Sequence, residues 1–266
     1  MLFGIGLLCY PSFANFINKQ FESKAIASYN SKIASMSTQE TKRALKLAQA
    51  YNQSLPAAYP ADPFTGENVR DFTGTEFETF PMVQQGSMIG YVEIEAIDVY
   101  LPIYYGTSAE VLQKGAGLVD NTSLPVGGEG THAVIAAHTG LASKKLFTDL
   151  TEVQEGTVFF IHVLDMNLAY QVDQIKAVLP EDVSDLFIEE GKDYVTLLTC
   201  TPYGVNDHRL LVRGTRIDYD FGQKQEASSL RRLDMYSWMV VLGVCLFAIL
   251  ILVLRRKRKQ KNTGDE

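Results

Sequence analysis

Cysteine is scarce in this chain. Three cysteines occur among 266 residues, and two of them, Cys9 and Cys245, lie in the apolar stretches near the two ends. Cys200 is therefore isolated, which excludes a framework of intrachain disulfides in the central part of the chain. An isolated thiol is either buried and inert or retained for its reactivity. Cysteine content alone does not decide between these two alternatives.

Closely spaced metal ligands are lacking too. The four histidines are scattered, and the sequence contains no C-x2-C or H-x3-H pair of the kind that zinc sites use. It also contains no glycine-rich phosphate-binding loop and no internal repeat. We therefore expect neither a metal ion nor an organic cofactor.

Basic residues are in deficit over most of the chain. The formal net charge is −7, and residues 255–266 alone hold six of the 24 Lys and Arg but two of the 31 Asp and Glu. The rest of the chain is thus more acidic than the total indicates. Because phosphate binding requires a basic surface, this balance excludes nucleic acid as a partner.

The basic tail follows a long uncharged run. Residues 236–254 contain 19 residues without a charge, and a helix of that length spans ~28 Å at ~1.5 Å per residue, close to the thickness of the hydrocarbon layer. Tyr236 and Trp238 stand where interfacial aromatic residues are expected, and the positive-inside rule places the tail in the cytoplasm. This predicts a transmembrane helix, with the body of the protein outside the cell; a buried core helix is the alternative.

The first residues are also apolar. Residues 1–17 carry no charge, although Pro11 lies among them and no basic residue precedes the apolar run. We interpret this segment as an export or anchor segment rather than as part of a core.

Two helices and a long loop are predicted next. The pattern of residues 18–55 is helical, and Ser37 and Glu40 have the spacing of a capping box. Residues 56–85 are rich in Pro, Gly, Asp and Thr without periodicity, which is typical of a functional or disordered loop. The apolar face of the second helix is expected to consist of Ala44, Leu47, Ala48, Tyr51 and Leu55.

Residues 86–220 have the texture of a β-domain. Short runs rich in Val, Ile, Tyr and Thr are separated by Gly, Asp, Asn and Pro, which predicts an all-β barrel or sandwich. A short helix is expected at residues 108–119, and residues 221–235 are read as a linker. The predicted strands cover 88–97, 99–105, 131–138, 157–163, 168–179, 193–200 and 208–218.

The last two of these runs form the candidate site. If they pair as a hairpin, Thr196, Leu198 and Cys200 share one face, because side chains alternate along a strand. The intervening residues are turn formers, so the hairpin brings Cys200 beside Arg209. A guanidinium near the sulfur favours the thiolate and can hold the oxygen of a tetrahedral intermediate. A solvated cation at a strand end is the alternative for Arg209.

A cysteine nucleophile needs an imidazole for proton transfer. His132 and His138 share strand parity, but at ~3.3 Å per residue they lie ~20 Å apart, so only one can serve Cys200. We favour His138 because it ends its strand before a turn, whereas His132 begins the strand at the opposite rim. The other two histidines are expected to be structural or to face away: His162 and His208.

These residues resemble the sortases, the membrane-bound cysteine transpeptidases of Gram-positive bacteria. "TLLTC" resembles the family signature TLxTC, and the histidine of "AAHTGL" and the arginine after "GVNDH" fall where that family has its His and Arg. The resemblance implies an eight-stranded sortase-type β-barrel with added helices. It implies Cys200 as nucleophile, His138 as general acid and base, Arg209 as stabiliser of the intermediate, and substrate contacts at Leu198 and Thr199.

Two features are similar to the pilus-assembling class C sortases. One is the predicted C-terminal transmembrane helix in addition to the N-terminal segment. The other is "ADPFTGE", which matches the lid motif of that class at Asp62, Pro63 and Phe64. The resemblance implies that Asp62 approaches Arg209 and that Phe64 covers the cysteine; a simple turn is the alternative.

The activity implied by this resemblance is cleavage of an LPxTG-like sorting signal between Thr and Gly through a thioester on Cys200. The partners implied are pilin subunits that carry such signals and acceptor lysines, together with the membrane. Two alternatives remain. One is an enzyme that anchors proteins to the wall through a peptidoglycan amine, and the other is a membrane-anchored β-barrel binding module with an inert Cys200.

Overall fold

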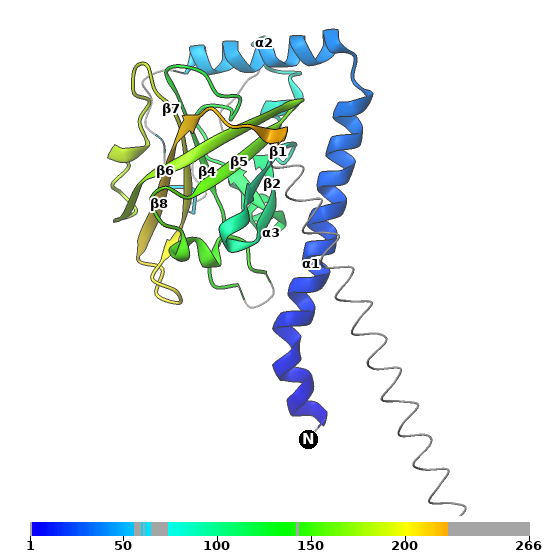
Figure 1. Cartoon of the computed structure of the whole chain (residues 1–266), viewed down its shortest axis with the longest axis vertical. Helices are drawn as coiled ribbons and strands as arrows, with labels where there is room; N and C mark the ends of the chain where they lie inside the picture. The colour runs from blue at the N-terminus through cyan, green and yellow to red at the C-terminus, as the bar shows by residue number, and fades with distance from the viewer. Residues whose placement is uncertain (1, 56–59, 61, 65–73, 142–143, 223–266) are drawn as a thin grey trace, which may run out of the picture. The chain divides into compact units, whose positions relative to one another are not determined.

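Eight strands close into a barrel in the order β1-β2-β3-β4-β7-β8-β6-β5 (Figure 1). The computed structural model describes residues 2–55, 60, 62–64, 74–141 and 144–222, with side chains from residue 13 onward. The strands are β1 (Met88–Ile94), β2 (Val99–Tyr105), β3 (Ala116–Leu118), β4 (Thr131–Ala136), β5 (Val158–Val163), β6 (Met166–Val178), β7 (Asp193–Thr201) and β8 (His208–Ile217). The predicted barrel with added helices is thereby confirmed.

The chain divides into two compact units, residues 1–217 and 218–266. The barrel and its helices belong to the first unit. Of the second unit the structure describes residues 218–222, in which the rings of Tyr219 and Phe221 pack edge to face with centroids 5.1 Å apart. Of the predicted linker (221–235) the structure describes residues 221–222, and the predicted transmembrane helix (236–254) and basic tail (255–266) lie outside the described residues. Among the helices that are described, none combines the length and apolar character needed to cross a membrane.

Parallel pairing of two strands fixes the position of the candidate site. β4 runs parallel to β7, with Ala133 opposite Val195 and Ala136 opposite Leu198, whereas β7 and β8 are antiparallel. The carboxyl ends of β4 and β7 therefore reach the same edge of the barrel, where β8 begins. Residues that follow β4 and residues at the end of β7 are thus brought together from distant parts of the chain.

The barrel interior is filled by aliphatic and aromatic side chains. Along β7, Val195 and Leu197 belong to this core, which also holds the stacked rings of Phe159 and Tyr170, 5.7 Å apart. The outer face of β7 is covered as well, because Leu198 belongs to a second apolar cluster. Its buried members are Val119, Val134, Ala136, Leu186, Leu198 and Leu211, and Phe64, Val178 and Val183 pack against it. Burial on both faces explains why residues 194–199 are all buried and do not alternate with exposed ones.

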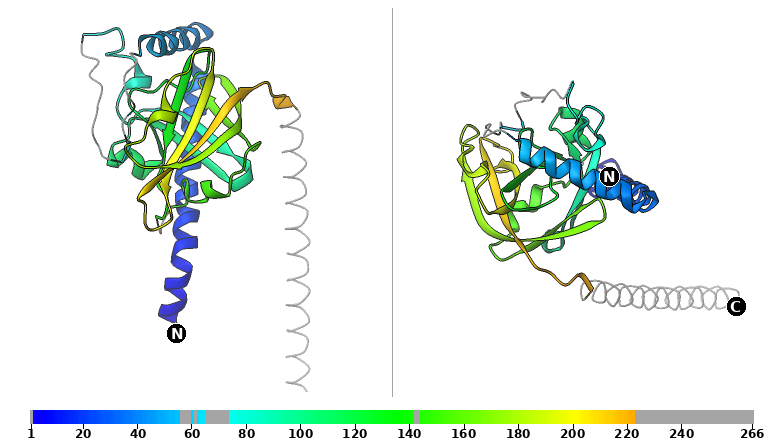
Figure 2. Two further views of the ribbon diagram at one scale, coloured as in Figure 1. Left: turned by 90° about the vertical axis from the view of Figure 1, so that its left-hand side faces the viewer. Right: turned by 90° about the horizontal axis from the view of Figure 1, so that it is seen from above.

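Two helices precede the barrel (Figure 2). α1 covers Leu2–Ser35 and α2 covers Thr38–Ser54. α1 continues through Pro11 without a break, so the predicted boundary between residues 17 and 18 does not coincide with an end of secondary structure. It packs on the barrel through Ile26 and Tyr29, and the Tyr29 hydroxyl donates to the Ile89 carbonyl oxygen at 2.8 Å.

The capping box at the start of α2 is present as predicted. The Ser37 amide donates to the Glu40 carboxylate at 2.7 Å, and the Glu40 amide donates to the Ser37 hydroxyl at 3.2 Å. Tyr51, on the predicted apolar face, is fully buried. Asn52 fastens the end of the helix by donating to the Leu124 carbonyl (3.0 Å) and accepting from the Leu124 amide (2.7 Å).

Two predicted elements differ in the structure. The strand expected over 88–97 ends at Ile94, and Glu95–Ile97 forms a 3-10 helix. The helix expected over 108–119 is correct for α3 (Ala109–Lys114), but Ala116–Leu118 is strand β3, which pairs with β2 and β4. A strand of three residues is too short for period-two alternation to be detected. Gly117 is needed there because a Cβ on it would lie 2.4 Å from the Gly106 carbonyl oxygen.

Candidate active site

Cys200 and Arg209 lie directly opposite each other on β7 and β8. The same register pairs Leu198 with Leu211 and Thr196 with Arg213, which is the arrangement that strand parity predicts. Cys200 is partly exposed and is a free thiol. The hairpin thus presents a sulfur and a guanidinium side by side at the barrel edge.

The parallel pairing of β4 and β7 brings His138 to the same edge. One residue beyond β4, the Ala137 amide donates to the Leu198 carbonyl at 3.1 Å, so the pairing extends towards His138 and Cys200. Thr199 reinforces it, because its hydroxyl donates to the Ala137 carbonyl at 2.7 Å. The Thr199 side chain is buried in this contact, and the substrate contact that the resemblance implies for it stays a prediction. Leu198 lies in the outer apolar cluster.

Asp62 holds the guanidinium of Arg209. Nε and Nη2 of Arg209 each donate to one Asp62 carboxylate oxygen at 2.8 Å, and the Asp62 side chain is only 7% exposed. Nη1 donates to the carbonyl oxygens of Asn206 (3.2 Å) and His208 (3.1 Å). A two-point ion pair of this kind fixes both position and plane of the guanidinium. All three nitrogens of Arg209 are therefore occupied by the protein itself.

Phe64 lies over the remaining parts of the site. Its ring centroid is 5.4 Å from that of His138, and the Arg209 Cζ lies 5.1 Å from the same ring centroid. The second contact is a cation–π interaction. Pro63 between the two contacting residues is buried. Residues 62–64, which we call the covering segment, thus contact both His138 and Arg209.

Burial dominates the electrostatics of the cysteine and the histidine. It raises the pKa of the Cys200 thiol; the nearby Arg209 acts to lower that pKa and Asp62 acts to raise it. Burial also lowers the pKa of His138. Both shifts favour the uncharged thiol and imidazole, since desolvation penalises the charged form. With the covering segment in place, burial thus acts against the ion pair of thiolate and imidazolium.

His132 is structural. It is buried at the other end of β4, where its Nδ1 lies 2.8 Å from the Phe187 carbonyl oxygen and its Nε2 lies 2.7 Å from the Thr196 hydroxyl. A carbonyl only accepts, so Nδ1 carries the proton and Nε2 accepts from the threonine. Burial lowers the pKa of this histidine as well. His132 is thus fully bonded and remote from the β4 end that carries His138.

The other two histidines are also engaged elsewhere. His162 contacts Glu93 at 3.0 Å and stacks on the Tyr91 ring with centroids 4.3 Å apart. His208 bonds its neighbour Asp207 at 2.8 Å. The structure therefore brings His138 to the edge of the barrel that carries Cys200 and Arg209, whereas the imidazoles of the other histidines bind other residues. Among the residues that the structure describes, no group of three or more His, Cys, Asp or Glu could hold a metal ion.

The sequence reasoning missed the part played by Asn206. Its backbone is left-handed (φ 62°), which turns its carbonyl oxygen towards Arg209. The available signal was its place among the turn formers, because asparagine tolerates this conformation better than most residues.

Residues 92–217 match a family model described as the sortase domain. Among curated proteins, sortase A of Streptococcus agalactiae is 31% identical over 117 residues, which cover 43% of this chain and 47% of that protein. The chain thus matches about half the length of this relative.

Solved structures resemble the chain over a larger share. A sortase C of Streptococcus pneumoniae, described with its catalysis and pilin substrate specificity, is 48% identical with a TM-score of 0.66, covering 74% of this chain and 97% of the other. Sortase C of Clostridium perfringens, solved with its C-terminal cell wall sorting motif, is 45% identical with a TM-score of 0.64, covering 74% and 100%.

Proposed function

The chain belongs to the sortase family, and on that basis we propose that it is a cysteine transpeptidase that joins pilin subunits through LPxTG-like sorting signals. One observation carries the proposal: Cys200, His138 and Arg209 come from three elements to one edge of the barrel. A nucleophile, a proton carrier and a fixed cation are the groups that acyl transfer through a thioester requires.

The reaction proceeds in two halves. The Cys200 sulfur attacks the carbonyl carbon between Thr and Gly of the sorting signal as its proton passes to His138. The developing oxyanion is stabilised by Arg209. Collapse of the intermediate breaks the C–N bond, the glycine amine leaves with the proton from His138, and the acyl group stays on sulfur as a thioester. An acceptor amine then attacks the thioester and gives its proton to His138. The C–S bond breaks as the amide forms, and His138 returns that proton to the sulfur, which restores the Cys200 thiol.

A pilin lysine is the acceptor we favour, because the similar solved structures are sortases C and one is described with pilin substrates. Incubation of the enzyme with a purified pilin that carries both a sorting signal and the acceptor lysine is expected to give a ladder of covalent multimers on a denaturing gel. A pilin whose acceptor lysine is replaced by arginine is the control. Cleavage of the signal without a ladder would instead favour an enzyme that uses water or a peptidoglycan amine.

The covering segment acts as a lid in this proposal. A substrate carbonyl that is to be stabilised by Arg209 must take the place of the Asp62 carboxylate, which holds two of the guanidinium nitrogens. A substrate must also displace the Phe64 ring to reach His138. Opening would remove Asp62 and part of the burial, the two factors that raise the pKa of Cys200, so the same movement frees the cation and favours the thiolate.

We further propose that the catalytic domain lies outside the cytoplasmic membrane of a Gram-positive bacterium. The support is the uncharged run 236–254 and the basic tail that follows it, both outside the described residues. Protease treatment of intact cells is expected to remove the barrel and to spare a tag at the C-terminus. Protection of the barrel in intact cells would contradict this location.

A further inference from the structure

The backbone that follows His138 is held by a short segment downstream of it. The Phe147 amide donates to the His138 carbonyl at 3.2 Å, and the Gly140 amide donates to the Thr148 hydroxyl at 3.2 Å. Residues 145–148, which we call the bracing segment, therefore fix the residue that carries the imidazole and the turn after it.

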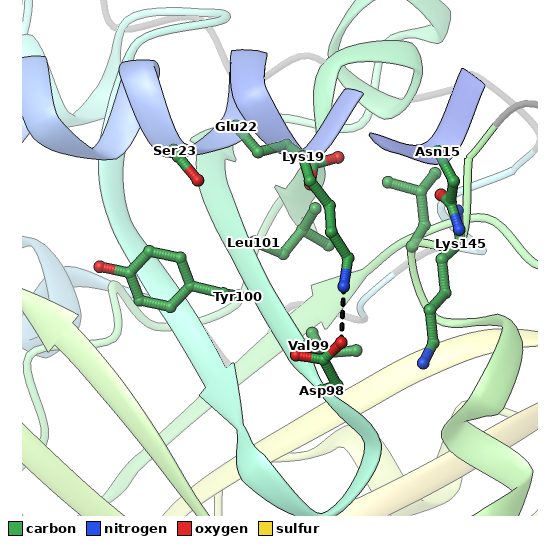
Figure 3. A pocket seen from close by; sticks show the side chains of 10 residues that line it. Asn15, Lys19, Glu22, Ser23, Asp98, Val99, Tyr100, Leu101 and Lys145 are labelled. Atoms are coloured by element: carbon green, nitrogen blue, oxygen red, sulfur yellow. Dashed lines mark hydrogen bonds and ion pairs between the residues drawn. The ribbon is translucent and has the colours of Figure 1, made fainter. Parts of the chain in front are cut away.

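Lys145 anchors the bracing segment to α1, to the turn before β2 and to the residue that follows the segment. Its amide donates to the Asn15 side-chain oxygen of α1 at 2.9 Å. Its ammonium donates to the Ile97 carbonyl at 2.7 Å and pairs with Asp149 at 2.6 Å. Figure 3 shows Asn15 and Lys145 next to each other where α1 passes over the barrel, at the edge of a cavity of about 210 Å³. The Lys145 side chain is only 24% exposed, so these contacts are partly shielded from water.

Leu146 and Phe147 show that the backbone of the bracing segment is constrained. Leu146 has a left-handed backbone (φ 44°), which is unfavourable for a residue with a Cβ, and it is 4% exposed. Phe147 is fully buried and supplies the amide that binds the His138 carbonyl. The left-handed backbone of Leu146 persists only where neighbouring contacts hold it. Here those contacts are the burial of Leu146 and Phe147 in the core and the hydrogen bonds of Lys145.

We propose that Asn15 and Lys145 are positioning residues for His138, through which α1 sets the place of the imidazole relative to Cys200. The inference rests on the proposed function of His138 and adds α1 to the machinery of the site. Neither residue contacts a reacting group; they act through the Lys145 amide, the strained Leu146 and the Phe147 amide, in that order.

A control variant can distinguish the general packing of α1 on the barrel from its contact with the bracing segment. Lys19, one turn along α1 from Asn15, pairs with Asp98 at 2.5 Å, and Figure 3 marks this contact. The pair joins α1 to the start of β2 without touching the bracing segment. Because both partners are largely exposed, it contributes little to stability. Lys19→Met is therefore a matched control for the loss of a contact between α1 and the barrel.

The test uses the full chain in detergent micelles and compares Asn15→Ala, Lys145→Met, Asn15→Asp and Lys19→Met. Steady-state cleavage of an LPxTG-type peptide gives kcat and KM, and an NMR titration of isotope-labelled histidine, assigned with His138→Gln, gives the pKa of His138. We expect Asn15→Ala and Lys145→Met to lower kcat by about 5- to 10-fold with KM changed by less than about twofold, because a loosened base affects chemistry rather than binding.

The titration provides a second readout that does not depend on turnover. Since burial lowers the pKa of His138, loosening its loop is expected to raise that pKa towards its ordinary value in the same two variants. Asn15→Asp retains the accepting oxygen and should behave like the native chain, as should Lys19→Met. If Lys145→Met does not fold, the comparison of Asn15→Ala with Asn15→Asp decides whether α1 positions His138.

The inference is overturned if Asn15→Ala leaves both kcat and the pKa of His138 unchanged, or if Lys19→Met changes them as much. Should the peptide not be cleaved even by the native chain, the proposed function fails. The titration still decides whether Asn15 and Lys145 position His138.

Discussion

Replacement of Cys200 by alanine is expected to lower the rate of LPxTG-peptide cleavage by at least about 10⁴-fold. The thioester has no other atom to form on, and the loss of a catalytic nucleophile removes nearly all of the covalent route. Burial of Cys200 is only partial, so the sulfur is accessible to a substrate once residues 62–64 move. A fluorogenic peptide that spans the Thr–Gly bond measures the rate.

Cys245→Ala is the matched control for this substitution, because it removes another thiol far from the site in sequence. Its rate should equal that of the native chain. Cleavage by Cys200→Ala within about tenfold of the native rate would mean that the sulfur is not the nucleophile, and the binding-module alternative would gain support.

Replacement of Asp62 by alanine is expected to speed the alkylation of Cys200 by about tenfold or more at neutral pH. The substitution removes two charge-assisted hydrogen bonds to Arg209, and each such bond contributes about 1.5–3 kcal/mol, so the open state of the lid gains population. Because Asp62 and burial both raise the pKa of Cys200, their loss lowers it, and the alkylation profile should shift towards lower pH. Intact-mass measurement of iodoacetamide labelling over a pH series follows both effects.

Asp207→Ala is the control for Asp62→Ala. Asp207 is an exposed acid in the connection between β7 and β8, close to Arg209 in sequence, but its carboxylate bonds His208 rather than Arg209. It should leave the labelling rate unchanged within about twofold. Equal labelling of Asp62→Ala and the native chain at every pH would show that the covering segment does not restrain access to the thiol.

Most strands of the barrel could be predicted from the sequence, because strands and turns have local sequence patterns. Alternation within the β7 and β8 runs and the turn formers between them placed Cys200 opposite Arg209, and the register bears this out. The β3 strand was missed because three residues that include a glycine carry no periodicity. The continuity of α1 across the predicted boundary between residues 17 and 18 was missed too, because that boundary was set by where charged residues begin, and a change of composition does not end a helix.

The long-range contacts of the site could not be derived in the same way. The choice of His138 over His132 rested on strand ends, whereas the decisive fact is the parallel register of β4 on β7, which no local pattern encodes. The approach of Asp62 to Arg209, across 147 residues, came from a family resemblance and not from the residues themselves. The Asn15 contact with Lys145 had no sequence signal, because an amide on one helix and a backbone N–H on a distant loop leave no pattern.

The most direct test of the account is the intact mass of the enzyme after incubation with an LPxTG-type peptide in the absence of an amine acceptor. If Cys200 is the nucleophile, the mass increases by that of the acyl fragment that ends at threonine, and the adduct is located on Cys200 by peptide mapping and removed by hydroxylamine. An enzyme that cleaves the peptide but carries the adduct on another residue, or shows none even when quenched rapidly, would contradict it.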